Sequence, residues 1–309
     1  MNIKELYKTF LENSSSKETI SNDIDSKHTR IIQNSKNNLE NLNSINFRNW
    51  FEQSDMGLKY KMTYFSKIFL GLKNIFFLNF LFDFLKKRLN HIFEYSSMID
   101  DIQIIKSLSG EDLIIENPQN KTPGATNFPL VNGYSVTPRW LRYLYLLNQF
   151  KRFKLLKDEQ VWLDIGSYYG GLQGLVKKYF PQATVIMLDF NHQLARSYIY
   201  LKQMYPNCNH ILPNQISKIK NLNKIPKGSI LYVEIADLKK LNQFKIDTVT
   251  NFFSLGEMKR NTFNNYLKSD FIINCETLYF VNRFNSSPFY DMTYDDSINV
   301  FDYRIKKNI

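Results

Sequence analysis

Cysteine and histidine are scarce in this sequence, and their scarcity excludes several kinds of site. The 309 residues include two cysteines, Cys208 and Cys275, and four histidines. Two thiols cannot build a disulfide framework or a tetrathiolate metal site, and the histidines lack the i, i+3 or i, i+4 pairing of zinc hydrolases. We therefore expect a reducing, cytoplasmic compartment, no metal site, and chemistry carried by a bound organic cofactor or by carboxylates.

A long uninterrupted apolar run is also missing. The most apolar stretch, residues 64–85, contains Lys67, Lys73 and Asp83, and each charge at the centre of a bilayer costs about 2.5–3.5 kcal/mol. No apolar run follows the first residues, so the sequence predicts no signal peptide. We expect buried helices over the aromatic stretch. The alternative is an interfacial helix over residues 64–88 that makes a peripheral membrane contact.

The basic surplus is not gathered into one block. Forty Lys and Arg residues outnumber 29 Asp and Glu residues, which gives a net charge of +11. No run of five or more like charges occurs. A diffuse surplus is typical of a solvated surface rather than of a stripe that follows a nucleic-acid backbone. We therefore expect no nucleic-acid partner.

The first half of the chain is polar at its start and then helical in pattern. The overall composition, 43% apolar and 15% aromatic, is that of a globular protein. Residues 1–45 are predicted to be loosely ordered, except for a short amphipathic helical turn around Leu6, Phe10 and Leu11. Residues 46–153 are predicted to form several helices, because apolar residues recur there at helical spacing.

The helical part of the sequence ends in two recognisable segments. Prolines and glycines crowd residues 117–138, which predicts a long, ordered loop. Residues 140–153 follow as an apolar helix. The character of the sequence then changes, and residues 154–309 are predicted to form a separate cofactor-binding domain.

Short apolar runs alternate with helical patterns in this second half. The predicted helices are Leu172–Tyr179 and His192–Met204. The predicted strands are 161–165, 184–188, 248–253, 271–274 and 298–301, and the third strand is either 210–213 or 230–233. Such alternation predicts an α/β fold with a Rossmann-like, doubly wound and mostly parallel sheet.

A glycine loop lies between the first of these strands and the first helix. It reads D-x-G-x-x-x-G, with Asp164, Gly166, Tyr168 and Gly170, and Asp189 ends the next strand 23 positions after Gly166. The spacing differs from the G-x-G-x-x-G of dinucleotide enzymes and predicts an S-adenosylmethionine loop. In this hypothesis Asp164 lies near the cationic sulfonium, and Asp189 accepts the ribose hydroxyls. The alternative is that the two glycines only make a tight turn.

The same segments resemble the sugar O-methyltransferase family. The resemblance rests on residues 161–201, on N-F-F-S-L-G-E-M at 251–258, on 262–267 and on 278–283, and it covers about residues 125–290. It implies the fold of class I S-adenosylmethionine-dependent methyltransferases. It also implies transfer of a methyl group to a sugar hydroxyl of a bacterial surface-glycan precursor, either nucleotide-linked or lipid-linked.

A sugar hydroxyl is a poor nucleophile, so a positioned base would assist the transfer. Glu257, just past the fourth strand, is the first candidate, and His192, after the Asp189 turn, is the second. The alternative for Glu257 is a carboxylate stabilised by a helix dipole. The alternative for His192 is a surface histidine at the start of a helix.

Five further residues are candidates for binding. Asp237 could accept the adenine amino group if 230–233 is the third strand. Asn251 and Ser254 could contact cofactor or acceptor, or cap the next helix. Tyr169 could stack on the substrate or pack in the core. Arg283 could contact an anionic sugar or form a structural salt bridge.

Two alternative functions belong to other classes. The isoelectric point of about 9.3 would suit an RNA methyltransferase, but residues 251–254 read N-F-F-S rather than the N-P-P-Y of base-amino methyltransferases. A non-catalytic protein could instead use residues 64–85 to bind a membrane or a partner. We favour the sugar O-methyltransferase.

Overall fold

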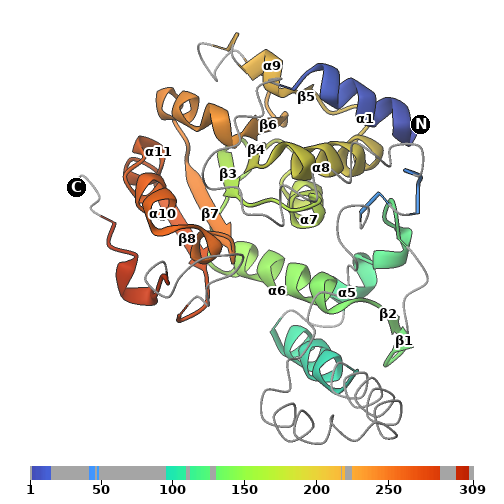
Figure 1. Cartoon of the computed structure of the whole chain (residues 1–309). Coiled ribbons are helices and arrows are strands. Elements are labelled where there is room, and N and C mark those ends of the chain that lie inside the picture. Colours follow the sequence, from blue (N-terminus) through green and yellow to red (C-terminus); the bar gives the residue numbers. More distant parts are fainter. Residues whose placement is uncertain are drawn as a thin grey trace, which may run out of the picture. The chain divides into compact units, whose positions relative to one another are not determined.

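The computed structural model describes residues 2–14, 42–45, 47–48, 95–108, 112–125, 130–216, 218–219, 225–285 and 297–305 (Figure 1). The chain divides into two compact units, one formed by residues 54–148 and the other by residues 1–53 together with 149–309. The predicted helices between residues 49 and 94, the aromatic segment 64–88 among them, lie outside the described residues, as do residues 15–41. Among the residues described, no helix is long and apolar enough to cross a bilayer.

The unit of residues 54–148 contains the predicted Pro- and Gly-rich loop, which holds some regular structure. Its elements are helical residues 95–108, α5 (Asp112–Glu116), η2 (Gln119–Lys121), a hairpin of β1 (Leu130–Val131) and β2 (Tyr134–Ser135), and most of α6 (Pro138–Arg152). The Gln119 side chain accepts a hydrogen bond from the Thr137 amide at 2.7 Å. The Trp140 indole donates to the Asn117 carbonyl at 2.8 Å. These buried bonds fix the loop to the start of α6.

The second unit is built on a six-stranded sheet in which every pairing is parallel, in the order β5-β6-β4-β3-β7-β8. The strands are β3 (Val161–Ile165), β4 (Thr184–Asp189), β5 (His210–Ile211), β6 (Ile230–Glu234), β7 (Thr248–Phe252) and β8 (Thr277–Val281). The predicted α/β, Rossmann-like fold is confirmed. Both candidates for the third strand pair in the sheet, but 230–234 is the inner strand and 210–211 is a short edge strand.

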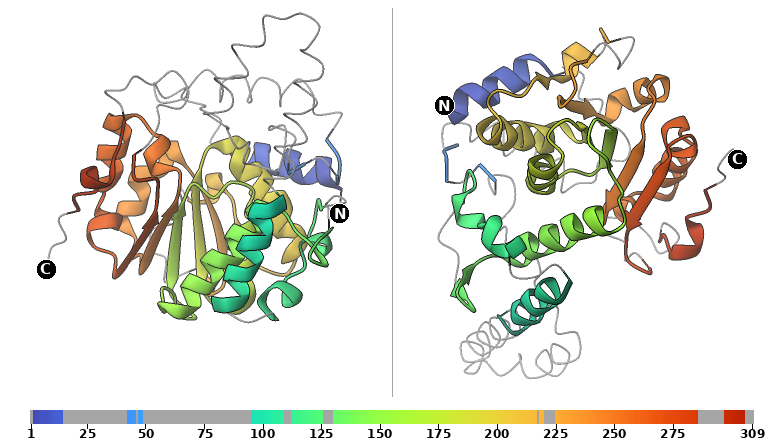
Figure 2. Two further views of the ribbon diagram at one scale, coloured as in Figure 1. Left: turned by 90° about the horizontal axis from the view of Figure 1, so that it is seen from below. Right: turned by 180° about the vertical axis from the view of Figure 1, so that it is seen from behind.

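Helices cover both faces of this sheet. Figure 2 shows α7 (Gly171–Tyr179) and α8 (Asn191–Met204) on one face. The 3-10 helix η4 (Ile235–Gln243), α10 (Arg260–Leu267) and α11 (Asp270–Ile273) lie on the other. The shorter elements are α9 (Pro213–Ile216), η5 (Leu255–Glu257) and η7 (Val300–Asp302). The two helices predicted for this half of the sequence are confirmed.

Two predicted strands are wrong. Residues 271–273 lie in α11. The prediction of a strand was wrong because a buried apolar run of this length fits a helix as well as a strand. The last strand is instead β8, at the edge of the sheet. Residues 298–301 make a single bridge, Asn285 to Asn299, and then enter η7. There Asn299 and Asp302 form a capping box, which favours helical over extended backbone.

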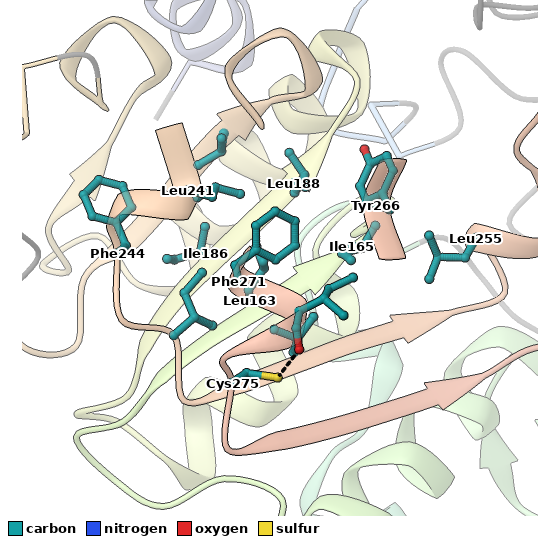
Figure 3. Packing of buried hydrophobic residues seen from close by; sticks show 14 of the residues in the cluster. Leu163, Ile165, Ile186, Leu188, Leu241, Phe244, Leu255, Tyr266, Phe271 and Cys275 are labelled. Atoms are coloured by element: carbon teal, nitrogen blue, oxygen red, sulfur yellow. Dashed lines mark hydrogen bonds between the residues drawn. The ribbon is translucent and has the colours of Figure 1, made fainter. Parts of the chain in front are cut away.

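A cluster of buried hydrophobic residues fills the core between the sheet and η4, α10 and α11 (Figure 3). Leu163 and Ile165 of β3 and Ile186 and Leu188 of β4 point into it. Cys275 lies at its border, where its thiol donates to the Ile272 carbonyl at 3.3 Å. A core of this kind fixes the strands rigidly, so the loops at their carboxyl ends start from defined positions.

The N-terminal helix is longer than predicted. The sequence predicts one turn, whereas α1 spans Ile3–Glu12 and packs against α8. Its buried residues follow helical spacing, and Phe10 is fully buried with its ring 5.9 Å from Tyr198 and 6.1 Å from Tyr232. Tertiary packing, which local composition does not reveal, therefore extends this helix.

The substitution Phe10→Ala is expected to lower the free energy of unfolding by about 3–5 kcal/mol, because it leaves a cavity between α1, α8 and β6. Leu11→Ala is the matched control in the same helix. Leu11 is 38% exposed, so its loss should cost less than about 1 kcal/mol. Urea unfolding monitored by circular dichroism would measure both. Equal losses would mean that α1 does not pack as described.

Candidate functional site

The predicted site residues gather where the strands of the sheet end. Parallel strands bring their carboxyl ends to one edge, and open α/β sheets bind ligands there. The loops after β3, β4, β6 and β7 meet at this edge. Ile165 of β3 is in register with Leu188 of β4 and Asn251 of β7, and Asp189 is in register with Glu234 of β6.

The glycine loop, residues 166–170, has an unusual backbone. Gly166, Tyr168 and Gly170 all have positive φ, at 84°, 54° and 86°. A Cβ atom on Gly166 would lie 2.6 Å from the Cβ of Ser254. A Cβ atom on Gly170 would lie 3.2 Å from Leu201 of α8. The first glycine therefore lets two loops approach, and the second lets α7 pack against α8.

Asp189 ends β4 and binds the glycine loop. Its carboxylate accepts hydrogen bonds from the amides of Phe190 at 2.7 Å and Tyr168 at 3.0 Å. The Ser167 hydroxyl lies at 3.4 Å from the same group. Burial raises the pKa of Asp189 to about 6, although these bonds and the nearby Arg196 guanidinium oppose the shift. A buried carboxylate with remaining acceptor capacity thus lies beside the loop.

Asp164 is occupied inside the protein. The Thr250 hydroxyl donates to one carboxylate oxygen at 2.6 Å, and the Gln173 amide donates to the other. The Trp162 indole donates in turn to the Thr250 hydroxyl at 2.8 Å. Burial raises the pKa of Asp164 well above its usual range. These bonds tie β3 to β7 and α7, and a role for Asp164 toward the sulfonium stays a prediction.

Two acidic residues follow the apolar run of β6. Asp237 pairs through one oxygen with Lys240 at 2.7 Å, while its Oδ2 atom is buried without a hydrogen-bond partner among the described residues. Glu234 accepts a hydrogen bond from the Asn191 side chain at 2.8 Å. Glu234 is not among the residues predicted from the sequence, although an acidic residue directly after a predicted buried strand is a usable signal. Asp237 thus offers a buried acceptor at this edge.

Asn251 connects three strand ends. Its amide nitrogen donates to the Ile165 carbonyl at 2.7 Å, and its oxygen accepts from the Leu255 amide at 3.1 Å and from Asn282 at 3.0 Å. Ser254 also donates to the Ile165 carbonyl, at 3.0 Å. The structure therefore gives both predicted residues bonds that hold the loops after β3, β7 and β8 together, and Asn251 binds the first amide of η5. Their contact with a ligand stays a prediction.

Glu257 and Arg283, predicted as catalytic base and substrate-binding residue, pair with each other. The Glu257 carboxylate lies 3.4 Å from the Arg283 guanidinium, and both side chains are partly exposed. This ion pair joins the loop after β7 to the residues after β8. The ion pair favours the salt-bridge alternative for Arg283 and identifies Glu257 as its partner, which the sequence did not predict.

His192 and Tyr169 are both buried. His192 is the second residue of α8, and its ring stacks on Phe190 with centroids 5.8 Å apart. The alternative of a surface histidine is therefore wrong. The fully buried Tyr169 ring contacts the rings of Tyr168 and Tyr200, each with centroids 5.2 Å apart. This favours the core alternative for Tyr169, and a catalytic role for His192 stays a prediction.

Two buried arginines behind the glycine loop were missed by the sequence analysis. The Arg196 guanidinium lies 4.7 Å from the centroid of the Tyr168 ring and donates to the Arg48 carbonyl at 2.6 Å. The Arg48 guanidinium lies 4.9 Å from the centroid of Tyr169 and 5.2 Å from that of Tyr200. These cation–π contacts support the strained loop from behind. No local sequence motif marks Arg48, and only the tertiary structure brings its side chain next to the loop.

The chemistry of these groups defines what the edge can bind. Asp189 and Asp237 follow the adjacent strands β4 and β6, and both are acceptors. Such a pair is suited to a ligand that presents hydroxyl and amino donors. Within the part of the chain that the structure describes, no three His, Cys, Asp or Glu side chains are placed to hold a metal ion.

Comparisons with known proteins give a weak structural similarity. No family model and no curated protein matches the chain. Among solved structures, a small RNA methyltransferase, HEN1, is similar with a TM-score of 0.29 and 18% identity. That match covers 42% of this chain and 15% of the other. The fold assignment therefore rests on the sheet itself, and the resemblance to sugar O-methyltransferases rests on the sequence motifs.

Proposed function

We propose that this protein is an S-adenosylmethionine-dependent O-methyltransferase that acts on a sugar hydroxyl. The observation that carries the proposal is the pair of buried carboxylates, Asp189 and Asp237, at the ends of adjacent strands beside the glycine loop. An adenosyl group presents two ribose hydroxyls and an adenine amino group as donors. Asp189 suits the hydroxyls, and the buried Oδ2 atom of Asp237 suits the amino group.

The acceptor side of the proposal uses the loops after β7 and β8. S-adenosylmethionine, when bound, supplies an electrophilic methyl group. Glu257 would accept the proton of the attacking hydroxyl, and Arg283 holds the Glu257 carboxylate at 3.4 Å. The sugar, nucleotide-linked or lipid-linked, is proposed from the motif at residues 251–258. Labelled S-adenosylmethionine incubated with such sugars would identify the acceptor.

Cofactor binding can be tested without an acceptor. The affinity for S-adenosylhomocysteine is expected to fall about tenfold between pH 7 and pH 5. The pKa of Asp189 is raised by burial to about 6, so the ionised acceptor dominates above pH 6 and is lost below it. At pH 5 about one molecule in eleven keeps the charge, against about ten in eleven at pH 7. Calorimetry across this range would measure the change.

Two variants make the pH experiment specific. Asp189→Asn should bind at least about tenfold more weakly at pH 7 and lose the pH dependence, because it removes the titrating group. Asp158→Asn is the control, since Asp158 accepts a hydrogen bond from the Gln182 amide before β4 begins. It should keep the wild-type curve. Absence of any binding to the wild-type protein would refute the cofactor assignment.

A further inference from the structure

An exposed aromatic pair follows β8 at the same edge of the sheet. Phe284 and Phe301 are 72% and 70% exposed, and their rings meet edge to face with centroids 6.1 Å apart. The Val300 amide donates to the Phe284 carbonyl at 2.9 Å, and Asn285 bridges to Asn299. Backbone bonds therefore hold the two rings next to each other.

Such a pair is not explained by packing. Single exposed apolar residues are common, but adjoining exposed aromatic side chains that the backbone holds in place are typical of binding surfaces. Folding gains little from rings that remain in water. A ligand could stack on the face of one ring and meet the edge of the other without ordering the rings first, because their backbone is already fixed.

The surroundings of the pair are basic. Arg283 precedes Phe284 and lies 3.4 Å from Glu257, with 42% of its side chain exposed. Arg304 donates to the Phe301 carbonyl at 3.2 Å. Arg260 pairs with Asp302, the residue after Phe301, at 3.0 Å. Among the residues that the structure describes, three arginines thus stand against two carboxylates, Glu257 and Asp302, and this balance favours a negatively charged ligand.

We propose that Phe284 and Phe301 form a platform for the acceptor, whose sugar ring stacks on the face of one phenyl ring and meets the edge of the other, and that Arg283 binds an anionic group on that sugar. This proposal rests on the proposed function and narrows its substrate to an acidic or phosphorylated sugar. The apolar C–H face of a sugar ring covers an aromatic ring, and a guanidinium binds carboxylate or phosphate through paired hydrogen bonds. The partner of Arg283, Glu257, is itself the proposed base, so an anion bound to Arg283 would lie close to the reacting hydroxyl.

Binding of defined sugars by the full-length protein tests the platform without any methyl transfer. The probes are UDP-glucuronic acid, which has a carboxylate and a diphosphate, UDP-glucose, which has only the diphosphate, and methyl glucuronide, which has only the carboxylate. The double variant Phe284→Ser/Phe301→Ser should bind the best probe at least about tenfold more weakly. Both positions are exposed, so the fold should be kept. Phe153→Ser is the control, because Phe153 is also exposed but its ring contacts Tyr279 in the middle of β8 rather than the pair that follows this strand.

The arginine has its own variant. Arg283→Met should remove the preference for the probe that carries the recognised anion. UDP-glucose and methyl glucuronide each carry one kind of anionic group, so comparing them shows whether that anion is phosphate or carboxylate. Unchanged sugar binding in the double variant would overturn the proposal, as would absence of binding of all three probes to the wild-type protein. A dimer that the double variant dissociates, with sugar binding intact, would assign the pair to self-association instead. Calorimetry with S-adenosylhomocysteine on the same samples tests the proposed function separately.

Discussion

Replacement of Glu257 by glutamine is expected to lower turnover about 10²–10⁴-fold while the affinity for S-adenosylhomocysteine stays nearly unchanged. Loss of a positioned base removes the proton acceptor for the attacking hydroxyl. Glutamine has the same shape and keeps an oxygen that can accept from Arg283, which lies 3.4 Å from the native carboxylate. The loss should therefore fall on kcat rather than on binding.

Glu276, at the amino end of β8, offers a matched control. Glu276 precedes β8, pairs with Lys245 at 3.4 Å and is exposed. Glu276→Gln removes the same charge far along the strand from the carboxyl ends, and it should leave turnover as it is. Rates of methyl transfer from labelled S-adenosylmethionine, measured at saturating acceptor, compare the two variants. Full activity of Glu257→Gln would remove Glu257 from the catalytic role.

Gly166→Ala is expected to lower the free energy of unfolding by about 4 kcal/mol. About 1–2 kcal/mol comes from placing a side chain at φ 84°. About 2–3 kcal/mol comes from overlap of the new methyl group with Ser254, whose Cβ would lie 2.6 Å away. Ser254 cannot withdraw easily, because it is bonded to the Ile165 carbonyl and to Asn251. Urea unfolding would measure the change.

The steric part of this effect can be separated from the backbone part. Gly133 has a similar φ of 81°, but a Cβ atom there would meet nothing within 4 Å. Gly133→Ala should therefore cost only the conformational share, about 1–2 kcal/mol. Ser254→Gly in the Gly166→Ala background should restore part of the loss. Equal costs at the two glycines would show that Ser254 does not limit the loop.

The sequence predicted the elements that carry strong local patterns. The first two predicted strands are mostly apolar and buried. The first, interrupted only by Asp164, leads into a glycine turn, and the second ends in Asp189, a pattern typical of buried parallel strands. The runs at 271–274 and 298–301 were wrongly predicted as strands, since three apolar residues and one asparagine do not distinguish a buried helix from a strand. At 298–301 the deciding signal was the spacing of Asn299 and Asp302, which form a capping box.

Local sequence patterns predicted several residues of the site, but they did not predict the contacts between residues that are distant in the sequence. Asp189 and the glycine loop follow from the order of strand, loop and helix. Arg48 and Arg196 meet although 148 residues separate them, and no local pattern encodes such a contact. The hydrogen bond from Thr250 to Asp164 likewise joins two strands whose residues are 86 positions apart in the sequence. Local patterns identify candidate ligands of a site, whereas tertiary packing decides which of them are free to bind.

The chain of hydrogen bonds from Trp162 through Thr250 to Asp164 gives this protein a native fluorophore next to the glycine loop. An indole emits at a wavelength that depends on the polarity and the hydrogen bond at its nitrogen. We therefore expect an event that moves Asp164 to alter the emission of Trp162. Binding of a ligand to the glycine loop could then be followed by the change in tryptophan fluorescence, with no label attached and no product formed.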